Sequence, residues 1–147
     1  SEPVPPPPGL LEALGAGAVF TGKNQFDYLV ELKSETVVRE LRPDFNLLAT
    51  LPVRGVIVTA RSQDPRHDFV SRFFAPAAGV NEDPVTGSAH CCLGPYWSAK
   101  LGRADLTGYQ ASLRGGVVRT GVRGDRVKLG GQAVTVMVGD LILEDGG

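Results

Sequence analysis

The chain has 147 residues, of which 42% are hydrophobic and 21% are charged, and its formal net charge is −1. This composition is ordinary for a globular domain that buries one core. The balanced charge gives no reason to expect a nucleic acid or an anionic membrane as partner, and no apolar run reaches the roughly 20 residues that cross a bilayer.

Residues 1–14 are interpreted as a lead-in to a main domain over residues 15–147. Residues 1–8 are rich in proline, which predicts an extended arm or linker, and residues 9–14 predict a short helix that ends at Gly15. The chain starts with Ser1, and its single methionine is Met137. We therefore expect a processed or trimmed chain, or a part of a longer protein.

Alternating apolar patterns predict strands separated by two short helices up to residue 74. A polar stretch at residues 23–25 predicts a hairpin connection, and Ser34 is a good helix N-cap. The predicted strands cover residues 19–21, 26–32, 54–60 and 68–74, and the predicted helices cover residues 34–41 and 43–48. The third of these strands is continuous and rich in β-branched residues, which is typical of a strand buried on both faces.

The second half of the domain is predicted to contain one apolar helix at about residues 87–101, ended by Gly102. Because few charges interrupt this helix, we expect it to be buried all round, with a sheet wrapped around it. Cys91 and Cys92 are then expected to be small buried side chains. Turn residues separate four further predicted antiparallel strands, at residues 109–113, 117–122, 126–129 and 133–138. The whole pattern predicts an α+β fold.

Residues 82–90 (Glu-Asp-Pro-Val-Thr-Gly-Ser-Ala-His) carry the most chemistry in the chain. Thr86 is a predicted N-cap, and the free N–H groups of Gly87 and Ser88 would bind a carboxylate or an oxyanion at the helix start. Asp83 would then act as a proton acceptor or donor, and the Ser88 hydroxyl as a donor. The plainer alternatives are a loop carboxylate that caps a turn and a helix residue bonded to backbone.

Other polar residues give weaker signals. Arg114 precedes two glycines and would hold a carboxylate through two hydrogen bonds, or else is a surface residue of a hairpin turn. Arg72 favours a structural salt bridge, and Glu82 a structural or solvated acid. His90 is expected to pack within the helix and His67 to be exposed, and their spacing does not predict a metal site.

The two cysteines are adjacent, and a disulfide between neighbours in a helix is strained. We therefore expect no disulfide framework and a reducing, cytoplasmic compartment.

Four stretches together resemble the phenazine-biosynthesis-like (PhzF-like) isomerase family. They are residues 72–76, 79–89, 110–116 and 124–134. The resemblance extends from about residue 25 to residue 141, and it implies the diaminopimelate-epimerase fold. In that fold two similar halves each wrap a sheet around a central helix, and the active site lies between them. The match is to the carboxy-terminal half, over residues 15–147.

The resemblance also implies a reaction, namely proton transfer on a small organic acid without a cofactor or a metal. It implies that Asp83 and Ser88 are catalytic, with Gly87 as the backbone anion binder, and Thr86 and Arg114 are expected to contact the substrate. The family's base is a glutamate of the amino-terminal half, which has no counterpart here. A two-thiol epimerase mechanism is not expected, because residues 84–87 contain no cysteine.

Two hypotheses on function follow. In the first, the chain is half of an isomerase and is inactive until an amino-terminal half supplies the base. In the second, it is a non-catalytic binding or interaction module, possibly a homodimer that imitates the two-half architecture, since symmetric dimers are the commonest assemblies. The identity of the substrate does not follow from the sequence.

Overall fold

The structure is a computed structural model, and it describes residues 1–140. The strands are β1 (Glu2–Pro3), β2 (Ala18–Lys23), β3 (Asp27–Leu32), β4 (Gly55–Arg61), β5 (Phe69–Phe74), β6 (Asp105–Gln110), β7 (Gly116–Arg123) and β8 (Arg126–Gly130). The helices are α1 (Leu10–Leu14), α2 (Glu35–Glu40), α3 (Phe45–Ala49), the 3₁₀ turn η1 (Pro76–Ala78) and α4 (Gly87–Leu101).

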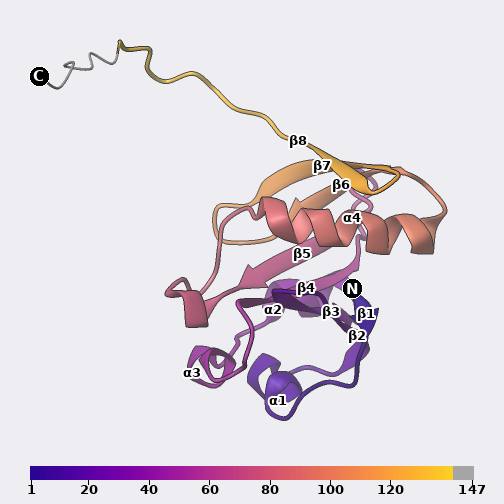
Figure 1. The fold of residues 1–147 in the computed structure, drawn as a ribbon, viewed down its shortest axis with the longest axis vertical. Coiled ribbons are helices and arrows are strands. Elements are labelled where there is room, and N and C mark those ends of the chain that lie inside the picture. The colour runs from indigo at the N-terminus through magenta and orange to yellow at the C-terminus, as the bar shows by residue number, and fades with distance from the viewer. Residues whose placement is uncertain (141–147) are drawn as a thin grey trace, which may run out of the picture.

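The strands form one sheet of 8 strands whose spatial order is the same as their order in the chain (Figure 1). Neighbouring strands are antiparallel except for the pairs β3–β4 and β5–β6, which are parallel. Each parallel pair needs a crossover connection, which α2 and α3 supply for the first pair and α4 supplies for the second.

Helices cover both faces of the central strands. Val56 and Val58 of β4 belong to one core, with residues of α1, α2 and α3, whereas Ile57 between them belongs to a second core with α4. This arrangement explains why residues 55–60 are all buried, as the continuous β-branched run predicts. Figure 1 shows α4 beside β6, β7 and β8, which it contacts, so the sheet wraps around this helix. The expected α+β fold is confirmed.

Local signals in the sequence account for most helix ends. The Ser34 side chain accepts a hydrogen bond from the Val37 N–H and starts α2, and Asp44 caps α3 in the same way. Gly102 ends α4 in a left-handed conformation with φ of 66°, a region that an L side chain rarely adopts.

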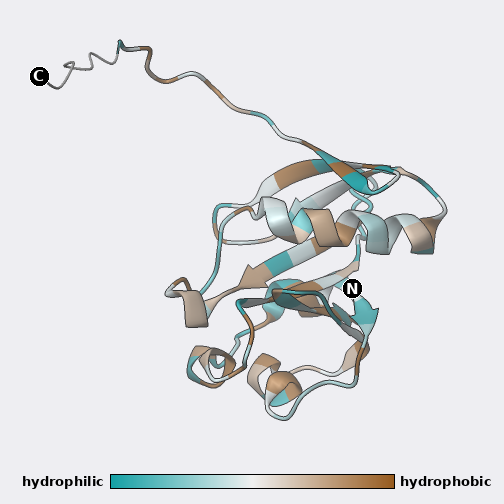
Figure 2. Cartoon of the chain, viewed as in Figure 1, coloured by the Kyte–Doolittle hydropathy of each residue, from teal (hydrophilic) through white to brown (hydrophobic). Residues whose placement is uncertain are grey.

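Three features at the ends of the sheet differ from what the sequence predicted. The proline-rich start is extended, but it is tied to the sheet, because Glu2 and Pro3 form β1 and pair with Lys23 and Gly22. Strand β6 begins at Asp105, earlier than expected, and it pairs in parallel with β5. Residues 133–138 form no strand, although their pattern alternates. This stretch extends away from the sheet without a partner among residues 1–140, and brown segments recur along it in Figure 2.

The expectation that α4 is buried all round is also wrong. Leu93 and Trp97 are buried against the sheet, whereas the opposite side of the helix is open. Cys91 is exposed, whereas Cys92 is half-buried and packs against the second core, so only Cys92 partly meets the expectation of a buried thiol. The exposed positions recur at helical spacing and are Gly87, Ser88, Cys91, Pro95, Ala99 and Lys100. A helix of uniform hydropathy gives no clue to which side stays open, so the sequence did not reveal this face.

Candidate functional site

A single buried amide holds the loop of residues 83–86 in place. The Gln110 side chain is fully buried, and its Oε1 accepts a hydrogen bond of 2.8 Å from the Thr86 N–H. Its Nε2 donates to the carbonyl of Asp83 at 2.7 Å and to Thr86 Oγ1 at 3.1 Å. Strand β6 therefore fixes the start of α4.

Asp83 is held at the end of β5 and is linked to this amide through Thr86. Its N–H donates to the carbonyl of Phe73 at 3.0 Å, and its Oδ2 accepts a short hydrogen bond from the Thr86 hydroxyl. Thr86 occupies the predicted N-cap position, but its side chain makes no capping bond because the hydroxyl is directed at Asp83. The Asp83 carboxylate is half-buried, and Oδ1 has no hydrogen bond within residues 1–140.

The first N–H groups of α4 remain available for a ligand. Gly87 and Ser88 are exposed, and no side chain caps the helix start. Uncapped N–H groups at a helix start carry a partial positive charge and bind anions. The arrangement therefore combines a carboxylate, two backbone donors and a hydroxyl within six residues of chain.

The Ser88 hydroxyl has a partner that the sequence did not reveal. Arg54 Nη2 lies 3.1 Å from Ser88 Oγ, and the same guanidinium binds the buried carboxylate of Asp27 at 3.0 and 2.5 Å. Arg54 directly precedes β4 and Asp27 begins β3, and these strands are parallel neighbours in which Asp27 pairs with Gly55. Arg54 and Asp27 come together only in this register, which the sequence does not reveal. The signal for the pair in the sequence was Asp27 itself, an acid at the edge of an apolar strand.

Arg114 lies in a turn that packs against the motif. Ser112 Oγ donates to the carbonyl of Pro84 at 2.7 Å, and a Cβ on Gly116 would overlap Val85. Arg114 itself is exposed and lines a groove with Val85 and Gly116, without a hydrogen bond to residues 1–140. The structure thus places the turn that carries Arg114 against Pro84 and Val85. Binding of a carboxylate by Arg114 stays a prediction.

The remaining candidates have structural roles. His90 is fully buried and its Nδ1 lies 2.8 Å from the carbonyl of Thr86, so Nδ1 carries the proton in the neutral ring. Burial lowers the pKa of His90, and the bond to Thr86 raises it in part.

Arg72 pairs with Glu82 through bonds of 2.7 and 2.9 Å, which confirms the predicted salt bridge. The side chain of His67 is only 11% exposed and stacks on Tyr109, so the expected exposure is wrong.

The site and the fold correspond to a known family. The sequence pattern of the phenazine biosynthesis-like proteins matches residues 11–139. The chain belongs to this family. A PhzF-family structure from Enterococcus faecalis is similar with a TM-score of 0.84 at 42% identity, over 88% of this chain and 49% of that one.

Relatives within the phenazine biosynthesis-like family are named isomerases. One from Halalkalibacterium halodurans, an uncharacterized isomerase, is 53% identical over 137 residues, which are 93% of this chain and 52% of the relative. An uncharacterized isomerase from Pseudomonas aeruginosa is 51% identical over 142 residues, which are 97% of this chain and 54% of the relative. The chain thus spans about half the length of these curated relatives.

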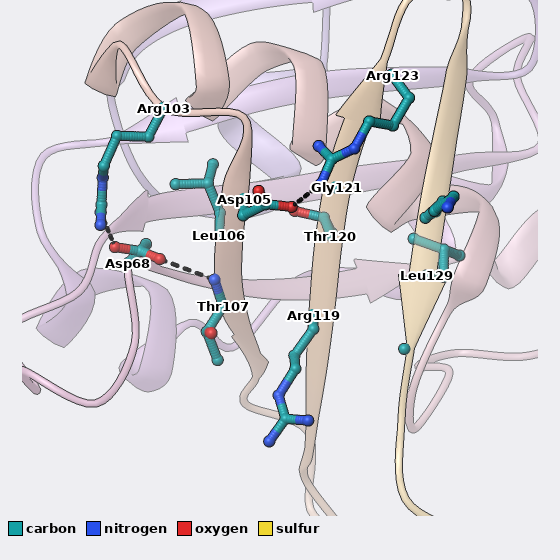
Figure 3. Close-up of a pocket in the computed structure, with 12 residues that line it drawn as sticks. Asp68, Arg103, Asp105, Leu106, Thr107, Arg119, Thr120, Gly121, Arg123 and Leu129 are labelled. Atoms are coloured by element: carbon teal, nitrogen blue, oxygen red, sulfur yellow. Dashed lines mark hydrogen bonds and ion pairs between the residues drawn. The ribbon is translucent and has the colours of Figure 1, made fainter.

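A second groove, over strands β6 to β8, lies apart from the phenazine biosynthesis-like motif. Figure 3 shows Arg103 paired with Asp68, and Arg123 paired with Asp105 at 2.6 Å. Arg119 on the same groove has no ion pair within residues 1–140. None of the predicted site residues lines this groove, and its acids are held by arginines, so we do not place the reaction there.

Two further observations concern metal-ligating side chains and membrane-spanning helices. Within residues 1–140, no three side chains of the types His, Cys, Asp and Glu gather as a metal site would require. None of the helices in the same part of the chain has the length and apolar character of a membrane span.

Proposed function

We propose that this chain forms one wall of the active site of an isomerase that moves a proton on a small organic acid. The observation that carries the proposal is the hydrogen-bonded chain from Gln110 through Thr86 to Asp83, beside the open N–H groups of Gly87 and Ser88. Family membership and the isomerase names of the relatives support it.

In this proposal each group has a defined part. A proton leaves the carbon next to the acid's carboxylate, and the negative charge that develops on oxygen is stabilised by the Gly87 and Ser88 N–H groups. Asp83 accepts or returns a proton, with Thr86 donating to the carboxylate in its charged form. Ser88 donates through its hydroxyl, and Arg114 contacts an outer part of the substrate. One proton is removed and one is added, so electrons balance without a redox partner.

We further propose that an amino-terminal half completes the site and supplies the facing base. The support is that the chain spans about half of its curated relatives and that the Gly87–Ser88 face of α4 is open. The isolated chain is then inactive.

The test mixes this chain with the first half of the Halalkalibacterium halodurans relative and follows exchange of carbon-bound hydrogen for deuterium by NMR. The substrates are short unsaturated and cyclic unsaturated carboxylic acids in D₂O. Asp83→Asn should abolish exchange, whereas the control Asp125→Asn, in an exposed turn, should not change it. Exchange that survives Asp83→Asn would make Asp83 a structural residue, and no exchange at any mixing ratio would count against the proposal.

A second candidate function is an interaction module that pairs with a copy of itself. It is favoured by the unpaired stretch after β8, where Val134, Val136 and Val138 are 86%, 92% and 90% exposed. Alternating apolar residues of this kind pair with a strand edge. Sedimentation at high protein concentration tests whether the chain forms a homodimer, because a strictly monomeric profile would rule out this second candidate function.

A further inference from the structure

The guanidinium of Arg54 is held in one position and keeps two donors unused. Of its five N–H groups, Nε and one on Nη2 bind Asp27, and the other on Nη2 binds Ser88. The two N–H groups of Nη1 have no partner within residues 1–140, and 39% of the side chain is exposed. A fixed cation beside the Ser88 hydroxyl therefore presents a free pair of donors.

The surroundings of Arg54 fix this orientation. Asp27 is only 1% exposed, so its carboxylate is a rigid anchor, and its hydrogen bonds raise the pKa of the guanidinium. The Arg54 N–H donates to the carbonyl of Phe26 at 2.8 Å. The guanidinium also lies over the rings of Phe26 and Phe73, at 5.2 and 5.7 Å from their centroids. A planar cation held on an aromatic ring loses little freedom when it binds an anion.

A groove adjoins these donors and has room for a small ligand. Its volume is about 390 Å³, within the usual range for small-molecule sites. Phe26, which is 53% exposed, and Pro95 provide apolar surface, while Asn24 and Gln25 provide polar groups at the hairpin between β2 and β3. Such a groove suits a compact acid with one anionic end and one apolar end.

We propose that Arg54 binds the carboxylate of the substrate at the Ser88 end of this groove, where it shares the charge with the Gly87 and Ser88 N–H groups, and that Asp27 is a positioning residue that holds Arg54. This inference rests on the proposed function for one point, which is the class of substrate. That substrate is an acid whose apolar part packs on Phe26 and Pro95. Arg114 is a poorer candidate, since none of the described residues holds its guanidinium in place.

The test measures binding rather than turnover and uses the chain as it is. A ¹⁵N-labelled sample is titrated with benzoate and with its neutral analogue benzamide, and chemical shifts are followed at the Arg54 Nε–H and the Ser88 and Cys92 amides. A charge-assisted bond contributes enough for a preference of benzoate over benzamide on the order of tenfold or more. Arg54→Met should remove this preference, and Arg54→Lys should restore only part of it because lysine lacks the planar fork.

The controls separate a binding role from a structural one. Arg119→Met removes an exposed arginine of the Figure 3 groove and should leave benzoate binding unchanged. Asp27→Asn should weaken benzoate binding although residue 27 does not contact the ligand, provided that the spectrum stays dispersed. In the reconstituted enzyme, Arg54→Met should raise KM more than it lowers kcat.

Two results would overturn the inference. One is equal binding of benzoate and benzamide by the original chain, or no binding of either. The other is unchanged benzoate binding by a folded Arg54→Met variant. These outcomes are independent of the deuterium-exchange assay, because a chain that binds benzoate through Arg54 without supporting exchange contradicts the proposed function and leaves this inference standing.

Discussion

Replacing Gln110 with leucine tests whether one buried amide holds the candidate site together. The change keeps a similar volume but removes three hydrogen bonds, those from the Thr86 N–H and to Asp83 O and Thr86 Oγ1. Each neutral bond contributes about 0.5–1.5 kcal/mol, and a buried group left unpaired costs about 1–3 kcal/mol. Gln110→Leu should therefore lower the free energy of unfolding by about 2–5 kcal/mol.

Urea unfolding followed by circular dichroism measures this loss. The matched control is Gln63→Leu, because Gln63 is exposed and its side chain makes no hydrogen bond within residues 1–140, so its effect should stay within about 0.5 kcal/mol. Deuterium exchange in the reconstituted enzyme should fall with Gln110→Leu even where the protein is folded. A loss below about 1 kcal/mol would refute the reasoning that Gln110 holds the loop.

Three further predictions concern a buried imidazole, a close backbone contact and an exposed thiol. Burial lowers the pKa of His90 in the native chain. Below about pH 6.5 the unfolded chain therefore binds a proton at this histidine more readily than the native chain does. The free energy of unfolding should consequently fall from pH 7 to pH 5, by at most about 1.4 kcal/mol per pH unit. His90→Gln should flatten this slope in urea titrations, and parallel slopes would contradict it. Gly116→Ala should destabilise the protein by about 1–3 kcal/mol through overlap with Val85, whereas Gly131→Ala, with open space around it, should be neutral in the same assay. Iodoacetamide should label Cys91 first under native conditions, as read by peptide mass spectrometry, and equal labelling of its neighbour would show that the exposed face of α4 is wrongly described.

The sequence predicted local features well because their causes are local. The cap at Ser34 and the glycine that ends α4 each depend on a few neighbouring residues, and both are confirmed. The acid, the threonine and the serine of residues 83–88 were found because their spacing at a helix start has a chemical meaning.

Features that depend on pairing between distant strands were not predicted. Arg54 meets Asp27 only because β3 and β4 are parallel in one register, and Gln110 reaches Thr86 only because β6 pairs with β5. The open side of α4 was missed because the helix has nearly the same hydropathy on both sides. The sequence therefore identified one wall of the candidate site and missed the groups that hold it.

The order of strands in the sheet has a consequence for folding. Since every strand lies beside its neighbour in the chain, the sheet can grow from β1 to β8 as the chain leaves the ribosome, and no strand must insert between two that are already paired. Antiparallel neighbours close short loops and should form early, whereas β6 must wait for α4 to cross the sheet. Docking of α4 is also the event that assembles the Asp83 loop, so the site would appear only when most of the sheet is complete.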